Sequence, residues 1–276
     1  MLWVGALSLV ISLLFFMAYN WNELGRIFKF FIVESFMGLV VVSYFFVDNY
    51  EVIQKVLLML ASITLGILLA LIGQTYQTGA DPWQLFAVWA LLMSPWAFFA
   101  NFSALWILWI LLINLSAILY FQKFNLLIFN LTDHTMLLLF TINAFLWTAW
   151  SFLEKKFVTF QDSVTIKILS FFTILYITFL ITSNIYAHVI KWELFALYAV
   201  FLSIIFYIYR VKKLNFYIMF LYSLSMFIFF FTLATKVLSY IESQNYIVFY
   251  FFIIFVIIIL TTTIVSWLKR LKKELL

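Results

Sequence analysis

Ten apolar stretches of 17 to 23 residues recur along the 276-residue chain, and they restrict its fold more than any other feature. About 20 apolar residues span a bilayer as an α-helix. Unpaired backbone groups are not tolerated in lipid, and the pattern lacks the alternation of a membrane barrel, so each stretch is predicted to be helical. The sequence therefore predicts an all-α, polytopic transmembrane helix bundle of about ten spans, within a range of eight to ten. The stretches cover residues 2–19, 27–47, 52–73, 84–100, 102–120, 135–152, 163–183, 192–209, 216–235 and 245–267.

The composition excludes the soluble classes of protein. Apolar residues make up 67% of the chain and charged residues 10%, against about 45–50% and about 25% in a soluble domain. A soluble enzyme, a nucleic-acid-binding module and a disordered tail are all excluded. The chain has no cysteine and two histidines, so we expect no thiolate metal site and no cysteine nucleophile. We expect the lipid bilayer as its surroundings, and no cofactor, metal or nucleic acid.

The distribution of basic residues predicts the orientation in the membrane. With an even number of spans, both termini and the even-numbered connections lie on one side, and that side carries 11 basic residues. The other side carries five, which are Arg26, Lys29, Lys123, Lys191 and Lys236. Because basic residues favour the cytoplasmic side, both termini are predicted to be cytoplasmic.

Glycine and proline divide the chain into two parts of different character. All six glycines and both prolines lie within the first 100 residues, and runs of Phe, Ile and Leu follow. We interpret residues 1–276 as a single integral membrane domain with a motif-bearing half, 1–120, and a hydrophobic scaffold half, 121–276. No internal repeat of the kind found in many transporters is evident.

The most distinctive segment is the polar, glycine-flanked stretch from Gly73 to Phe86, which joins the third and fourth spans on the predicted outer side. Asp81 is suited to cap the next helix, Pro82 to its first position, and Gln84 to a capping box. This structural interpretation leaves four polar residues unexplained, and for them a binding role is the alternative: Gln74, Tyr76, Gln77 and Thr78.

The same segment carries a family resemblance. The chain has Tyr19-Asn20-Trp21 before the second span, then Gly73-Gln74-Thr75-Tyr76-Gln77-Thr78-Gly79-Ala80-Asp81-Pro82-Trp83 and a tryptophan-rich span. Over roughly residues 1–120 this resembles a family of bacterial inner-membrane proteins known as domain of unknown function 2157. The resemblance implies a polytopic bacterial membrane protein. It supplies no reaction, substrate or catalytic residue.

Three polar residues lie inside predicted spans, where such residues are costly and often functional. Glu34, Asn114 and Asn143 all lie in the outer half by the predicted topology, about 9–12 Å below the outer ends of their helices. The asparagines are suited to hydrogen bonds between helices. Glu34 is either a structural carboxyl or a functional one that faces the interior.

Small residues mark a predicted packing face on the third span. Ser62, Gly66 and Ala70 recur at four-residue spacing, which lets another helix approach closely. Gly38 lies four residues after Glu34 on the second span. A close crossing of these two helices would bring Glu34 towards Gln74.

No enzyme motif of the usual kinds is present, so we expect no catalytic residue and no enzyme activity. Asp133, His134, His188 and Glu193 could in principle bind a metal, but loops far apart in sequence make a weak case. The basic residues from Lys269 to Lys273 are expected to set topology and to contact anionic headgroups.

Two functions remain open. The first is an outward-facing polar pocket that binds or transports a small solute in the bacterial inner (cytoplasmic) membrane. The alternative is a non-transporting membrane subunit or scaffold whose outer loops dock a periplasmic protein partner; the oligomeric state is not predicted. The predicted pocket lining consists of Glu34, Gln74, Tyr76, Gln77, Asp81, Asn114 and Asn143.

Overall fold

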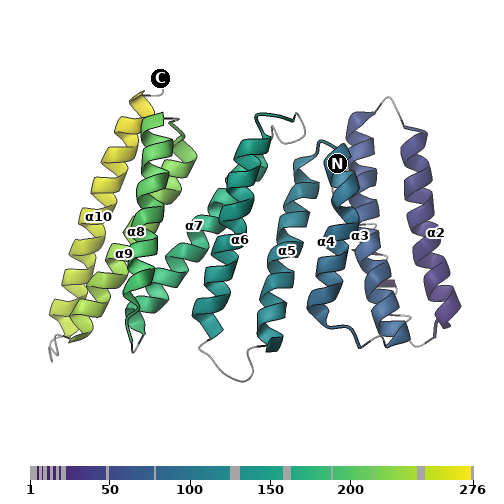
Figure 1. Ribbon diagram of the computed structural model, residues 1–276, viewed down its shortest axis with the longest axis horizontal. Helices are drawn as coiled ribbons and strands as arrows, with labels where there is room; N and C mark the ends of the chain where they lie inside the picture. Colours follow the sequence, from purple (N-terminus) through teal and green to yellow (C-terminus); the bar gives the residue numbers. More distant parts are fainter. Residues whose placement is uncertain are drawn as a thin grey trace. The chain divides into compact units, whose positions relative to one another are not determined.

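A computed structural model describes residues 5, 8, 11–12, 15–16, 19, 23–47, 50–77, 79–124, 131–157, 163–187, 189–212, 214–240 and 246–274. The described residues form nine α-helices and no strand, which confirms the predicted all-helical fold (Figure 1). A π-helical turn, η2 (Tyr207–Lys212), continues α8. The helices are α2 (Arg26–Phe45), α3 (Glu51–Tyr76), α4 (Pro82–Phe99), α5 (Ser103–Phe124), α6 (Leu131–Leu153), α7 (Ser163–Tyr186), α8 (Trp192–Phe206), α9 (Phe216–Tyr240) and α10 (Tyr246–Glu274).

Seven segments of the described chain are long and apolar enough to cross a membrane: α2, α3, α5, α6, α7, α8 continued by η2, and α9. Helices α4 and α10 coincide with two further predicted stretches, 84–100 and 245–267. The predicted stretch 2–19 lies largely outside the described residues. The total of ten spans and the side of the termini stay predictions.

The chain forms two compact units. Unit 1 comprises residues 1–126 and 152–165, and unit 2 comprises residues 127–151 and 166–276. Unit 1 therefore contains α2 to α5, and unit 2 contains most of α6 and α7 together with α8 to α10. The single-domain interpretation and the division into halves at residue 120 stay predictions.

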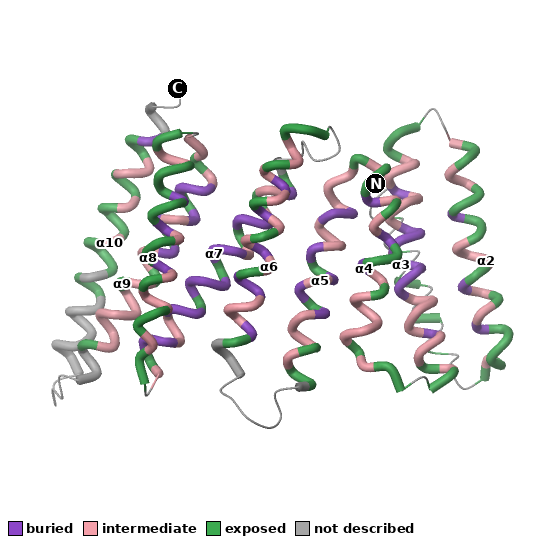
Figure 2. The backbone as a smooth tube through the Cα atoms, in the orientation of Figure 1, coloured by how far each residue is buried: buried purple, intermediate pink, exposed green. Residues whose placement is uncertain are grey.

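In unit 1, α2, α3, α4 and α5 pack in succession. Val33 and Val40 of α2 are seven residues apart, so they share one helix face. Val33 packs with Leu71, and Val40 with Val56 and its neighbours on α3. Figure 2 shows the buried positions along one side of α2 and along much of α3.

The connection from α3 to α4 needs unusual backbone conformations. Gln77, which follows α3, is left-handed with φ 46°, and Gly79 has φ 66°. Glycine adopts this conformation without the steric cost that a Cβ imposes. Asp81 then caps α4, and Pro82 occupies its first turn, where a missing N–H is harmless. The polar segment is thus a tight turn that positions α4 beside α3.

In unit 2, buried hydroxyl groups join α7, α8 and α9. The Oγ of Ser225 lies 2.6 Å from Oγ1 of Thr178 and 2.9 Å from the hydroxyl of Tyr198. Asn184 fixes the turn from α7 to α8, because its amide donates to the carbonyl of Lys191 and its Oδ1 accepts from the Lys191 N–H. In lipid the hydrophobic effect does little to drive helices together, so hydrogen bonds of this kind help to hold them in contact.

Candidate functional site

A cavity of about 1220 Å³, open to the surroundings over a large part of its boundary, lies between α3 and the first half of α4 in unit 1. Its lining reaches from Ile63, at the middle of α3, to the turn that follows this helix. Most of the lining is apolar, including Ile67, Ala70, Leu85 and Trp89. The body of this cavity is apolar and its polar groups are at the turn, so it differs from the predicted polar pocket, which stays a prediction.

Four polar side chains line the cavity at the turn: Gln74, Gln77, Asp81 and Gln84. Gln74 and Gln77 are exposed. A glutamine amide offers both a donor and an acceptor. A molecule in the cavity would therefore meet apolar walls along its length and hydrogen-bonding groups at one end.

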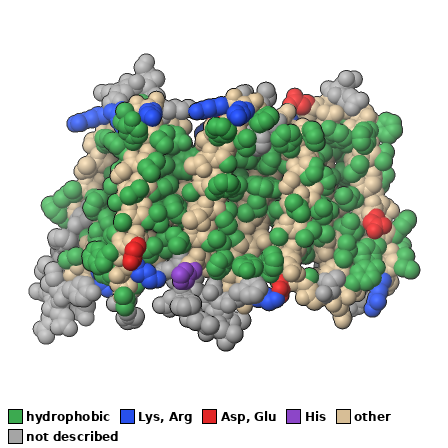
Figure 3. Space-filling view, viewed as in Figure 1, with side chains coloured by type: hydrophobic (Ala, Val, Ile, Leu, Met, Phe, Trp, Pro, Cys, Tyr) green, Lys and Arg blue, Asp and Glu red, His purple; other side chains and the backbone are tan. Residues whose placement is uncertain are grey.

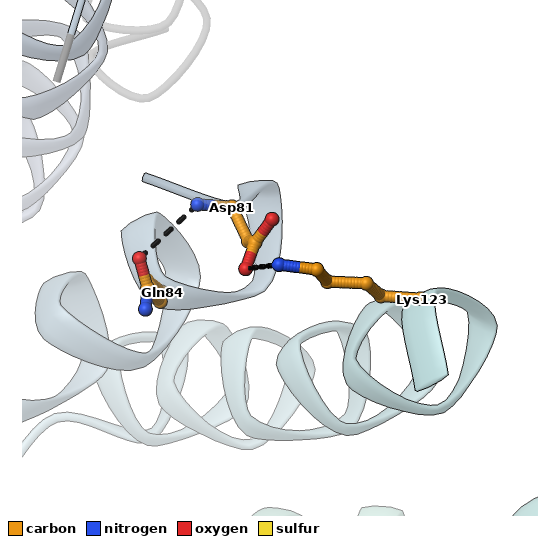
Figure 4. A network of polar contacts seen from close by, with 3 residues as sticks. All are labelled: Asp81, Gln84 and Lys123. Carbon is orange, nitrogen blue, oxygen red and sulfur yellow. Dashed lines mark hydrogen bonds and ion pairs between the residues drawn. The ribbon is translucent and has the colours of Figure 1, made fainter. Parts of the chain in front are cut away.

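Asp81 is held by two interactions (Figure 4). Its backbone N–H donates to Oε1 of Gln84 at 3.1 Å, within the capping box that the sequence predicts. Its carboxylate pairs with the ammonium group of Lys123, in the last turn of α5. This ion pair offsets the charge of Asp81, so the polar end of the cavity is close to neutral. Sequence reasoning missed Lys123 as its partner.

A chain of tryptophan and serine residues holds α3, α4 and α5 together. The indole N–H of Trp89 donates to the carbonyl of Ser62 at 2.8 Å, and that of Trp96 to the Ser62 Oγ at 2.5 Å. Trp109 of α5 donates to the Oγ of Ser94 at 2.9 Å. One part of this network could have been predicted from the sequence: Trp89 and Trp96 are seven residues apart, so they lie on the same face of α4.

Gly66 of α3 lies directly against the indole ring of Trp89 on α4. A Cβ atom added there would lie 2.4 Å from the indole ring of Trp89. The predicted small-residue packing face is therefore confirmed at Ser62 and Gly66, which contact tryptophan side chains of α4. Helix α2 also packs along α3, but Gly38 is not at that contact, because a Cβ there would meet no atom within 4 Å.

Three of the seven predicted lining residues line the cavity: Gln74, Gln77 and Asp81. Tyr76 does not, and its ring packs on Phe30 with centroids 5.8 Å apart. Asn114 is buried in α5, where its amide donates to the carbonyl of Ile110. Asn143 is buried in unit 2 and donates to the carbonyl of Leu139.

Glu34 corrects another expectation. It is exposed on α2 and does not line the cavity. It follows the buried Val33 directly, and one helical residue turns the side chain by about 100° away from the face that contacts α3. Glu34 is therefore on the exposed side of α2 and not in the interior as predicted.

Replacing Glu34 with leucine is accordingly expected to leave the melting temperature in detergent unchanged or raised. The side chain is exposed and forms no hydrogen bond or ion pair with another residue that the structure describes, so the change removes no such interaction. Val33→Ala, one residue earlier, should lower the melting temperature, because Val33 is fully buried. A loss of stability in Glu34→Leu as large as that in Val33→Ala would contradict the assignment of these two faces.

The predicted alternative of a metal site receives no support from the described residues, among which no group of three His, Asp or Glu side chains could hold a metal ion. His134 is exposed at the start of α6. His188 and the side chain of Asp133 lie outside the described residues.

Comparison with known proteins agrees with this architecture. A family model described as "Predicted membrane protein (DUF2157)" matches residues 1–106. No curated protein and no solved structure matches the chain. The match confirms the resemblance and includes α2, α3, α4 and all the described residues that line the cavity. Helices α6 to α10 lie outside it.

Proposed function

We propose that this membrane protein binds a small amphiphilic molecule between α3 and α4. The single observation that carries the proposal is the cavity itself, with apolar walls and hydrogen-bonding groups at one end. Ligand sites are commonly concave, largely apolar and equipped with a few placed polar groups.

The polar end of the ligand is expected to be uncharged. The Lys123 ammonium offsets the Asp81 carboxylate, and Gln84 already accepts a hydrogen bond through its Oε1. Gln74 and Gln77 have amide groups suited to a hydroxyl, ester or amide of the ligand. A charged head would have to compete with the ion pair. The chemical class that fits is an alkyl chain with a neutral polar head.

The position of the lining residues favours binding over transport, because they cover only part of the length of α3. The lining ends near the middle of α3 and does not include the described residues before Ile63 on that helix. A transport path needs access from both sides of the membrane. The proposal therefore includes neither a transport step nor a catalysed reaction. Docking of a periplasmic protein remains the alternative, and it would not require an occupied cavity.

A photoreactive probe tests the proposal. Purified protein in detergent is irradiated with a long-chain alcohol that carries a diazirine at mid-chain, and labelled peptides are mapped. Labelling within residues 63–89 should be competed away by unlabelled alcohol, because a site saturates and a lipid-facing surface does not. The matching fatty acid, which is charged, should compete less well.

Gly73→Leu supplies the matched variant for this experiment. Gly73 lines the cavity and a Cβ there would meet no atom within 4 Å, so a leucine can enter the free space without displacing a neighbour. We expect competable labelling to fall at least about tenfold, equivalent to about 1.4 kcal/mol, at an unchanged melting temperature. Gly38→Leu also extends into open space but lies outside the cavity, and it should label as wild type. Equal competable labelling in all three proteins would refute the proposal.

We also propose a bacterial inner-membrane location with ten spans and cytoplasmic termini, based on the 11 basic residues of one side against five. Within unit 1, the pairing of Asp81 with Lys123 is consistent with the placement of both segments on one side.

Cysteine labelling tests this orientation, since the chain has no cysteine of its own. In cells with permeabilised outer membranes, an impermeant maleimide should label Ala80→Cys and spare Lys212→Cys. Both positions are exposed. The reverse pattern would overturn the proposed orientation.

A further inference from the structure

One end of unit 2 gathers basic side chains from three helices. Lys167 lies in the second turn of α7, Arg210 and Lys212 lie in η2, and Lys269 and Arg270 lie near the end of α10. Consecutive helices of the unit run in opposite directions, so these segments lie at the same end (Figure 1). Figure 3 shows Lys and Arg side chains along the edge where α10 ends.

Contacts between the helices fix this arrangement. The hydroxyl of Tyr217, at the start of α9, donates to the carbonyl of Lys167 at 3.3 Å. The ring of Tyr222 lies 5.8 Å from that of Phe206 on α8 and 6.4 Å from that of Trp267 on α10. Helix α9 thus contacts each of the three segments that carry the basic residues.

Further hydrogen bonds and packing hold η2 and the end of α10 in place. The N–H of Asn215 donates to the carbonyl of Tyr209 at 3.2 Å, and Asn215 Oδ1 accepts from Ile218, which caps α9. Leu271 is 1% exposed, so the last turns of α10 pack into the unit. The neighbouring Lys269 and Arg270 remain exposed, as do Lys167 and Lys212.

The charged side chains of unit 2 that the structure describes at this end are all basic. Among the unit 2 side chains that the structure describes, the acidic one is Glu193, in the first turn of α8 at the opposite end. The sequence adds three basic residues and one acidic residue whose side chains are not described, Lys213, Lys272, Lys273 and Glu274. Aromatic rings lie at the same level: Lys212 Nζ is 5.1 Å from the centre of the Tyr207 ring. Aromatic and basic residues together are typical of the membrane–water interface.

We propose that this basic end of unit 2, formed by Lys167, Arg210, Lys212, Lys269 and Arg270, binds the headgroups of anionic phospholipids. A phosphate group accepts hydrogen bonds from ammonium and guanidinium groups and gains from their charge. Basic residues near a charged membrane surface contribute attraction that falls off within a Debye length. The surface lies in unit 2, so the inference is independent of the cavity in unit 1.

Energy transfer from tryptophan to a lipid with a pyrene-labelled acyl chain measures this binding. Purified protein in detergent micelles is titrated with the phosphatidylglycerol or the phosphatidylcholine form of the lipid. The wild type should prefer phosphatidylglycerol by about tenfold or more, given about 1 kcal/mol for each basic residue near the headgroups. The preference should weaken when salt is raised from about 0.1 M to about 1 M, because the Debye length falls from about 10 Å to about 3 Å.

The variant Lys212→Gln/Lys269→Gln/Arg270→Gln should lose most of the preference and retain its affinity for phosphatidylcholine. Lys191→Gln/Lys236→Gln is the control, since it removes basic residues from the opposite ends of α8 and α9. It should retain the preference. Equal affinity of the wild type for both lipids, or an unchanged preference in the triple variant, would overturn the inference. So would stronger displacement of the labelled lipid by a short oligonucleotide than by unlabelled phosphatidylglycerol.

Discussion

Replacing Gly66 with leucine is expected to prevent unit 1 from folding, the largest effect we predict for any single substitution. Even a Cβ at this position would lie 2.4 Å from the Trp89 ring, and leucine adds three more carbon atoms. Overpacking of a well-packed interior usually costs about 1–3 kcal/mol. The cost here should exceed that range, because the indole is also anchored to the Ser62 carbonyl. The measurement is the yield of monodisperse protein and its melting temperature in detergent.

Gly38→Leu is the matched control, because it makes the same change in a helix where a Cβ would meet no atom within 4 Å. It should be obtained in normal yield with a melting temperature close to that of wild type. If Gly66→Leu matches Gly38→Leu in yield and melting temperature, the contact between Gly66 of α3 and Trp89 of α4 is not as described.

The second large effect concerns the hydrogen bond from Trp96 to Ser62. Ser62→Ala removes the Oγ that accepts from the indole, while the backbone carbonyl that accepts from Trp89 remains. The indole N–H of Trp96, which is half-buried, then loses this acceptor. We expect the free energy of unfolding to fall by about 1–2 kcal/mol, near the upper end of values for such bonds between helices in membranes. Thermal or chemical denaturation in detergent measures it.

Combining Ser62→Ala with Trp96→Phe tests whether the two residues act as a pair. The double variant should lose less stability than the sum of the single variants, because the hydrogen bond can be lost only once. Ser203→Ala serves as a control, since Ser203 is exposed and its hydroxyl bonds to Ala199 on its own helix. Strict additivity of the two changes would count against the pair.

Helix positions were predictable from the sequence because membrane spans are set by length and hydropathy. The stretch predicted at 163–183 corresponds to α7 (Ser163–Tyr186), and that at 84–100 to α4 (Pro82–Phe99). The capping box was predictable for a different reason. Asp81, Pro82 and Gln84 act within one turn, so their spacing alone specifies their geometry.

Contacts between helices were not predictable in the same way. Which helix packs against Gly66 depends on how α4 is rotated about its own axis, because that rotation turns Trp89 towards α3. Hydropathy does not predict this rotation, because it is nearly uniform around such a helix. Glu34 was misplaced for the same reason, since its burial depends on which face of α2 meets α3. The pairing of Asp81 with Lys123 joins residues 42 positions apart, and it follows from the packing of α4 on α5.

A density map of the purified protein in lipid nanodiscs tests the central claim most directly. The account predicts elongated density between α3 and α4, running from the Trp89 ring to the amides of Gln74 and Gln77, in wild type. The same density should be missing from Gly73→Leu, whose helices should superpose on those of wild type. A map in which side chains fill the space between α3 and α4, or in which this space is empty in wild type, would contradict the account.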